Sequence, residues 1–247
     1  NSSFLLSFAV RGLLSGPPPT YGDLMVEVQW LDSNNIPLGL GLSLTIRNDT
    51  LILNDRFWST YLAVTTPAPN GATTARVVFR QERSDNTTGI GIDNVMFIRT
   101  ESTNLLANPS FEIGLNEWNS VNYMTGDNPF EGVFSARAFD RGYIFQDVNI
   151  GNSAGCCFLL SFAVSGVDGT LDIDFRGEVH WLDAQGRDLG LGLSLVVNDT
   201  GPQESDRYST VVALTEPAPK EATQARIQFT NATEGAPSID LITFTKL

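Results

Sequence analysis

Few residues of this sequence have the chemistry that catalysis needs. His180 is the only histidine, and Cys156 and Cys157 are the only cysteines. One histidine and two adjacent cysteines give too few ligands for a zinc site, and we expect neither a Ser-His-Asp triad nor a Cys-His pair. Neighbouring residues on a strand point to opposite faces, which predicts two half-buried thiols at the start of a strand. A disulfide to another subunit is the alternative for these cysteines.

Paired carboxylates could still support glycoside hydrolysis, which uses two Asp or Glu side chains. The obvious pairs are Glu27 with Asp32 and Glu178 with Asp183. Both pairs are explained more simply as ordinary strand and turn acids. We therefore predict a protein that is not an enzyme.

Polar residues that alternate with apolar ones suit binding better than catalysis. Two segments alternate with a period of two, which is typical of a half-buried strand. The apolar positions are Val26, Val28, Trp30, Val179 and Trp181, and the polar positions are Glu27, Gln29, Glu178 and His180. We assign both tryptophans to the core and expect the four polar residues to line the face on which a groove ligand would lie.

The segments that carry these residues occur twice in the chain. Residues 4–10 (FLLSFAV) return as residues 158–164, and Trp30-Leu-Asp returns as Trp181-Leu-Asp. A match of this length indicates duplication of a whole domain rather than a short solenoid repeat. We expect one module in residues 1–100 and a second in residues 101–247.

A Leu-Gly alternation lies in each copy, at residues 38–44 and 189–195. It predicts that Leu38, Leu40, Leu42 and Leu44 share one face of a strand. The glycines opposite them indicate close packing or a smooth floor for a ligand. No segment has the pattern of an amphipathic helix, so the fold class we predict is all-β, with two tandem jelly-roll β-sandwich modules.

The two copies differ at their starts. The 54 residues from Asn104 to Cys157 precede the shared FLLSF motif in the second copy, and three residues precede it in the first. We therefore expect the first module to lack its N-terminal strands, which leaves core residues and sheet edges uncovered. Either residues have been removed, or other copies of the chain supply strands and build a homopolymer.

Residues 104–114 (NLLANPSFEIG), followed by Trp118, resemble the opening of carbohydrate-binding modules of the galactose-binding-like jelly-roll superfamily, of the cellulose- and xylan-binding kind. Further similar motifs are Gln146-Asp-Val, the FLLSF strand, Trp58 before a strand, residues 67–76 and Ile92-Asp-Asn-Val. The resemblance covers residues 104–247 fully and residues 4–99 in part. It implies the fold more strongly than a ligand, because this superfamily holds sugar binders, protein binders and structural modules.

The resemblance also implies a structural calcium ion. Family members hold it with the glutamate of the opening Ser-Phe-Glu and the aspartate of the last strand, which are Glu112 and Asp240 here. Carboxylate oxygens suit calcium. Asp93 matches Asp240 in the first copy, where the glutamate would have to come from elsewhere. The alternative is that Glu112 caps a turn and Asp240 is solvated.

The aromatic residues outside the repeat motifs are the remaining candidates for a sugar platform. Trp58 and its counterpart Tyr208 are expected to pack inside the modules. Tyr123 and Trp118 are candidate platforms, although the family pattern places Trp118 in the core.

Charge and sorting features limit the partners. The net charge of −13 opposes nucleic acid and anionic membranes, and no stretch approaches the roughly 20 apolar residues of a membrane span. Five glycosylation sequons, at Asn1, Asn48, Asn86, Asn198 and Asn231, are expected on surface loops if the source glycosylates, and the alternative is that some of them arise by chance. For a secreted, cell-surface protein we predict a structural subunit that assembles into a filament or array by strand exchange or complementation. The alternative is a lectin-like protein that binds polysaccharide on its polar sheet faces.

Overall fold

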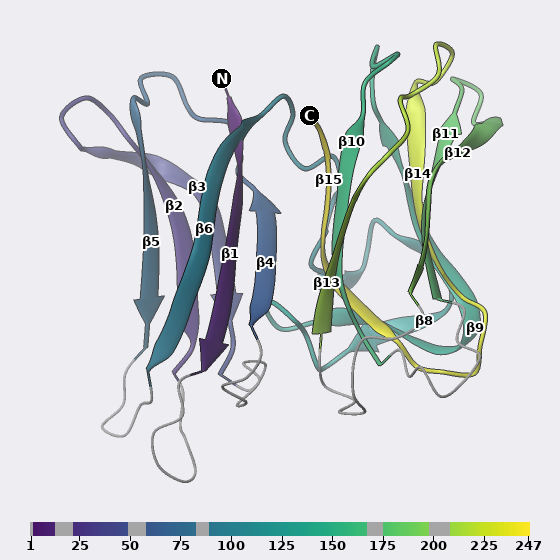
Figure 1. The fold of residues 1–247 in the computed structure, drawn as a ribbon, viewed down its shortest axis with the longest axis horizontal. Helices are drawn as coiled ribbons and strands as arrows, with labels where there is room; N and C mark the ends of the chain where they lie inside the picture. Colours follow the sequence, from purple (N-terminus) through teal and green to yellow (C-terminus); the bar gives the residue numbers. More distant parts are fainter. Residues whose placement is uncertain (1, 13–21, 49–57, 83–88, 167–174, 198–207) are drawn as a thin grey trace, which may run out of the picture. The chain divides into compact units, whose positions relative to one another are not determined.

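A computed structural model describes residues 2–12, 22–48, 58–82, 89–166, 175–197 and 208–247 (Figure 1). Every regular element in these residues is a β-strand, and none of them is helical. The described residues thus include no helix of the length and apolarity that a bilayer crossing requires. The chain divides into two compact units, one of residues 1–104 with 130–132 and one of residues 105–129 with 133–247.

The first unit is a sandwich of two three-stranded antiparallel sheets, in the orders β4-β1-β6 and β3-β2-β5. Its strands are β1 (Ser3–Gly12), β2 (Leu24–Leu31), β3 (Pro37–Ile46), β4 (Ser59–Val64), β5 (Thr74–Gln81) and β6 (Ile90–Thr100). Alternate residues of β2 face inward because successive side chains on a strand point to opposite faces. Val26, Val28 and Trp30 are therefore buried.

The second unit repeats these six strands and adds three before them. The added strands are β7 (Glu112–Leu115), β8 (Asn119–Gly126) and β9 (Ser135–Asn149). The repeated strands are β10 (Phe158–Ser165), β11 (Phe175–Leu182), β12 (Asp188–Val197), β13 (Tyr208–Leu214), β14 (Gln224–Asn231) and β15 (Ser238–Lys246). The strand order is β12-β11-β14-β9-β15-β10-β13, with β8 beside β9.

Strand β9 connects the two layers of the second unit. Its beginning pairs with β15, through Ala136 opposite Ile239, and its end pairs with β14, through Val148 opposite Ala225. One long strand therefore belongs to both sheets and closes the open side of the jelly roll, as Figure 1 shows for β8 and β9.

The predicted fold class is confirmed: both units are jelly-roll sandwiches, and the first has no described counterpart of β7–β9. The consequence is visible on β6, where a strand that is covered in one unit is bare in the other. The exposed fractions of Ile92 and Val95 are 38% and 50%, whereas Ile239 and Ile242, at the same places on β15, are completely buried. Strands β5 and β6 are sheet edges in the first unit, while β14 and β15 are interior strands in the second.

The prediction that four leucines share one face of β3 is wrong. A β-bulge lies between Val28 and Gln29 in the pairing with β3, and an extra residue in one strand reverses the faces beyond it. Leu44 is thus buried, whereas Leu38 and Leu40 are exposed on the outer face. The second unit repeats the arrangement, with Leu189 and Leu191 exposed.

The glycines of this alternation show why the strand bends here. A Cβ atom on Gly41 would lie 2.6 Å from the Trp30 Nε1 atom, and one on Gly192 would lie 2.4 Å from the Trp181 Nε1 atom. Only glycine allows the strand to approach the buried indole so closely. Close packing, rather than a ligand floor, explains Gly41 and Gly192.

Residues 130–132 belong to the first unit although they follow β8 in sequence. The Phe130 ring stacks on the Tyr61 ring with 4.1 Å between centroids. The Thr45 backbone N–H donates to Glu131 Oε1 at 2.9 Å. This short segment therefore covers part of β3 and β4.

The expectation of a surface loop is wrong for the sequon at Asn231. The Asn231 side chain is 1% exposed, and its Nδ2 donates to the carbonyl oxygens of Asp140, Thr233 and Gly235. This side chain therefore connects the loop after β14 with the backbone of β9. Asn48 is exposed as expected, and Asn1, Asn86 and Asn198 lie outside the described residues.

Candidate functional site

The four polar residues singled out in the sequence lie on the outer faces of β2 and β11. Their neighbours Val179 and Trp181 are buried, so Glu178 and His180 point away from the core, where both are half-buried. Burial of the valine and tryptophan positions confirms the assignment of both tryptophans to packing.

In the second unit, His180 is held between two carboxylates. Its Nδ1 lies 3.1 Å from Asp188 Oδ2 and its Nε2 lies 3.8 Å from Glu178 Oε2. The Gly190 backbone N–H, followed by the imidazole of His180, lowers the pKa of Asp188. On the other side, Ser194 donates its hydroxyl to Glu178 Oε1 at 3.1 Å. These contacts fix the orientation of the side chains that the sequence analysis predicted for ligand binding.

The polar row continues onto β14 and β9. Arg226 is opposite His180 in the β11–β14 pairing, and its Nε and Nη2 donate to the two carboxylate oxygens of Asp147 at 2.7 and 2.9 Å. The carboxylate raises the pKa of Arg226. A bidentate pair of this kind fixes both partners in one plane. With the groups on β11 and β12, the row of donors and acceptors spans four adjacent strands.

Two aromatic rings on β9 join this row. Tyr143 is 41% exposed, and its ring centroid lies 6.1 Å from that of Phe145. The Arg226 guanidinium covers the Phe145 ring at 4.1 Å. We name the face formed by Tyr143, Phe145, Asp147, Glu178, His180, Asp188, Ser194, Arg226 and Gln228 the polar sheet face.

The sequence analysis missed Tyr143 and Phe145. Their signal was present in the alternation of β9, where Ile144 and Val148 are buried between outward-facing residues. The predicted platforms are instead inside the unit: Trp118 and Tyr123 are each 7% exposed. The Trp118 result agrees with the family pattern, and the Tyr123 expectation is wrong because a buried ring offers no face to a sugar.

The first unit has a reduced version of this face. Glu27 and Gln29 are half-buried on β2, and Gln29 Nε2 donates to Glu27 Oε2 at 2.9 Å. Arg76 is opposite Gln29, but β5 is the edge of this sheet and no described strand pairs with its other side, so the described residues hold no counterparts of Asp147 and the two rings. The second unit thus has the more complete version of this face.

Trp58 and Tyr208, expected to pack alike, differ. Tyr208 is buried, its hydroxyl donates to the Asn128 carbonyl oxygen at 2.6 Å, and burial followed by the charge of Asp240 raises its pKa. Trp58 is 40% exposed, with the Arg11 guanidinium 4.7 Å from its ring centroid. The packing prediction holds for Tyr208 and is wrong for Trp58.

Two of the four carboxylates considered for hydrolysis, Asp32 and Asp183, accept backbone N–H groups of turns. Asp32 Oδ1 accepts the backbone N–H groups of Asn34 and Ile36, both at 2.8 Å. Asp183 caps the equivalent turn in the second unit, where the Arg187 backbone N–H is the main cause that lowers its pKa. These acids stabilise hairpins between strands, which is the simpler role that the sequence analysis favoured.

The residues expected to hold calcium also accept hydrogen bonds from backbone N–H groups. The Glu112 carboxylate accepts the backbone N–H groups of Val133 and Phe134 at 3.0 to 3.1 Å. Asp240 is completely buried and accepts the Leu241 N–H, as the exposed Asp93 accepts the Asn94 N–H. Within the described part of the chain, no three or more His, Cys, Asp or Glu side chains gather as a metal site would require. Calcium bound by Glu112, Asp240 and Asp93 stays a prediction.

The cysteines are free and half-buried just before β10, as expected. A bond from Cys156 or Cys157 to another subunit stays a prediction.

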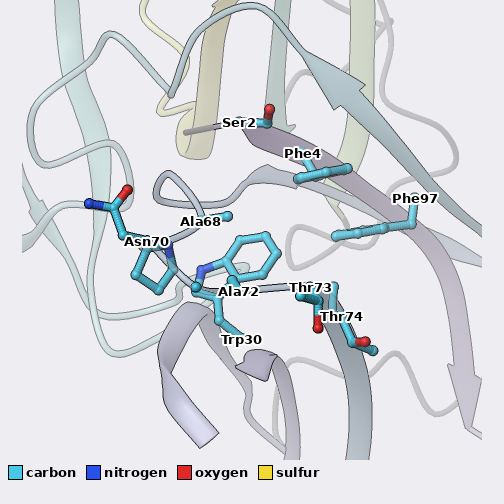
Figure 2. Close-up of a pocket in the computed structure, with 12 residues that line it drawn as sticks. Ser2, Phe4, Trp30, Ala68, Asn70, Ala72, Thr73, Thr74 and Phe97 are labelled. Atoms are coloured by element: carbon cyan, nitrogen blue, oxygen red, sulfur yellow. The ribbon is translucent and has the colours of Figure 1, made fainter. Parts of the chain in front are cut away.

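A second candidate site is a pocket of about 690 Å³ in the first unit. Figure 2 shows that Phe4, Phe97 and the Trp30 indole point into the same space, which the loop from Ala68 to Thr74 borders. The Phe4 and Phe97 rings stack with 4.9 Å between centroids, and Trp30 is 3% exposed. The pocket therefore has an apolar floor and a rim of backbone, Asn and Thr groups.

Three solved structures illustrate what this chain is similar to. The enzymatically active domain of tailspike protein 4 from bacteriophage CBA120 is 17% identical with a TM-score of 0.48, over 58% of this chain and 21% of that one. The module TmCBM61, solved with β-1,4-galactotriose, is 17% identical with a TM-score of 0.44, over 59% of this chain and all of that one. The tandem CBM22-1–CBM22-2 domain of Paenibacillus barcinonensis Xyn10C is 11% identical with a TM-score of 0.43, over 100% of this chain and 79% of that one.

Carbohydrate-binding modules, a tandem pair included, are among the solved structures similar to this chain. No protein-family model matches the chain, and no curated protein does.

Proposed function

We propose that this protein is a non-catalytic polysaccharide-binding protein that acts outside the cell, and that the polar sheet face of the second unit is its binding surface. The observation that carries the proposal is the fixed row of charged and polar groups from β12 to β9 beside the Tyr143 and Phe145 rings. Sugars are bound by such combinations, because hydroxyl groups exchange hydrogen bonds with polar side chains while aromatic rings cover the apolar faces of the sugar.

The charges of this surface favour a neutral ligand. Arg226 neutralises Asp147, and the carboxylates of Asp188 and Glu178 lie on either side of His180, so these groups give the face no excess of positive charge for an acidic polymer. The net charge of the chain is −13, which repels polyanions. We therefore expect neutral polysaccharides such as xylan, cellulose or galactan to bind better than acidic ones.

The test is affinity electrophoresis and calorimetry of the full chain with xylan, cellulose and galactan, together with peptidoglycan. Tyr143→Ala and His180→Ala should each weaken binding at least tenfold, since each removes a direct contact. Gln29→Ala, at the position of His180 in the first unit, is the matched control and should leave binding unchanged. Absence of binding to all these glycans would refute the proposal.

A second candidate function is that of a structural subunit that assembles through the first unit into a filament or surface array. The observation that favours it is the pair of uncovered edges, β5 and β6, with Ile92 and Val95 exposed. Such edges bind additional strands. Negative-stain electron microscopy and light scattering of the native protein test it, and a monodisperse folded monomer would contradict homopolymer formation.

Complementation is the more economical form of this assembly. The described residues contain two places for a β7–β9 segment and one such segment. Exchange of that segment between copies fills one place by emptying another, so the number of open edges stays the same. An additional strand segment is needed to cover β5 and β6.

A further inference from the structure

The pocket in the first unit has the same walls as a filled region of the second unit. The Ala68 N–H donates to the Ser2 carbonyl oxygen at 2.9 Å, and the Ala218 N–H donates to the Cys156 carbonyl oxygen at 2.9 Å. Further along the loop, Thr73 N–H binds the Leu31 carbonyl oxygen as Thr223 N–H binds that of Leu182. The loop that borders the pocket therefore has the same backbone hydrogen bonds as the equivalent loop of the second unit, where the space is filled.

Side chains from the segment that the first unit lacks fill the counterpart of the pocket. Leu106, Val148 and Ile150 are at most 7% exposed and belong to the same core cluster as Trp181 and Phe244. Trp181 and Phe244 are the counterparts of Trp30 and Phe97, which line the pocket.

Backbone groups make the same correspondence. In the second unit, the Ile150 N–H donates to the Thr223 carbonyl oxygen at 3.0 Å and the Leu105 N–H donates to the Phe244 carbonyl oxygen at 2.8 Å. Val148 is opposite Ala225 in the β9–β14 pairing. The equivalent positions in the first unit are Thr73, Phe97 and Ala75, and all three line the pocket.

Three alanines that line the pocket are more exposed than their counterparts in the second unit, as expected if the pocket is empty. Ala218, Ala222 and Ala225 are 0 to 3% exposed. Their counterparts Ala68, Ala72 and Ala75 are only half-buried.

We propose that the pocket and the edges of β5 and β6 form the docking site of an extended polypeptide segment with the chemistry of β9. The segment pairs antiparallel with β5 and places two aliphatic side chains, at the positions of Val148 and Ile150, against Trp30 and Phe97. Residues 105–150 of the same molecule already fill the second unit, so the docked segment is an additional one. The inference rests on the second candidate function and names the ligand of the uncovered edges.

A strand suits the site better than a sugar. The Phe4 and Phe97 rings each turn one face to the other, and the Trp30 indole is buried, so these aromatic faces are closed to a sugar. The edge of β5 instead offers a register of backbone donors and acceptors, which β-augmentation uses.

The probe for the test is a labelled peptide with the sequence of residues 142–151 (GYIFQDVNIG), added to the full chain. We expect saturable binding by fluorescence anisotropy, with slower hydrogen exchange of the β5 amides. A peptide with Asp at the positions of Val148 and Ile150 should bind at least tenfold more weakly. Ala75→Leu, which fills the pocket, should weaken binding by a similar factor, whereas Arg76→Leu, which points to the other face, should not.

A fused chain gives an independent measurement if the free peptide binds weakly. Residues 104–155 are placed before Ser2, so that the first unit receives its own β7–β9 segment. The β5 and β6 amides should then be protected from exchange, and the denaturation midpoint of the first unit should rise. Unchanged exchange of β5 and β6 in both experiments, or their protection by xylo- or galacto-oligosaccharides instead of the peptide, would overturn the inference. Peptide binding by a protein that stays monomeric alone would support the docking site and contradict only the homopolymer.

Discussion

Gly192 lies so close to the Trp181 indole that a Cβ atom at this position would stand 2.4 Å from its Nε1 atom. The same contact recurs between Gly41 and Trp30. Each sandwich therefore depends on one glycine that lets a bulged strand pass over a buried tryptophan.

Gly192→Ala should destabilise the second unit, because either the indole or the strand must move. Overpacking of this kind costs about 1–3 kcal/mol in the free energy of unfolding. Urea denaturation followed by tryptophan fluorescence measures the change. Leu191→Ala is the control, since Leu191 is 54% exposed, and an equal loss in both variants would contradict the explanation.

The bare edge of the first unit predicts unequal effects of one substitution at equivalent sites. Ile242→Ala should cost about 2–5 kcal/mol, as for other buried aliphatic residues. Val95→Ala should change the free energy of unfolding by less than about 1 kcal/mol, because Val95 is half exposed. Similar losses for both variants would mean that β6 is covered in solution.

Asn231 should stay unmodified when the protein is produced in a glycosylating host. Its Nδ2 donates to three carbonyl oxygens inside the second unit, so a glycan there would break all three bonds. Glycopeptide mass spectrometry tests this site, with the exposed Asn48 as the internal comparison. Asn231→Ala should lower the free energy of unfolding by about 1–3 kcal/mol, because buried carbonyl groups lose their donor.

The stability of the second unit should fall in acid. The pKa of Asp183 is lowered in the folded state, mainly by the Arg187 backbone N–H, and that of Asp188 is lowered by the Gly190 N–H. A lowered pKa means that the contribution to stability is complete above the ordinary aspartate pKa of about 4 and is lost as the pH falls below it. Urea denaturation between pH 7 and pH 3 measures the loss. Asp183→Asn should be less stable at pH 7 and should show a smaller decrease on acidification; an unchanged pH dependence would count against this role.

Much of the architecture could be predicted from the sequence because its evidence is local and repeated. The alternation of Val179 and Trp181 with Glu178 and His180 placed two residues in the core and two on the outer face, since side chains on a strand alternate. The duplication predicted the sandwiches, and the unequal starts of the two copies predicted which strands the first unit lacks.

Other features depended on contacts between distant segments. A bulge reversed the faces of Leu38 and Leu40, and a single inserted residue has no reliable signature within a Leu-Gly alternation. Tyr123 is polar enough for a surface, but the fold buries it. Asn231 belongs to a sequon, but three carbonyl oxygens from the fold surround it.

The sequence by itself determined the repeated strands and the polarity of their faces, because both follow from residue order along one strand. Only the tertiary structure decided that Tyr143, Arg226 and His180 form one surface. The strand that carries Tyr143, β9, becomes the neighbour of β14 only in the folded sandwich. The described residues of the first unit include no counterpart of this closing strand. The pocket beside Trp30 lies at the place where β9 packs beside Trp181 in the second unit.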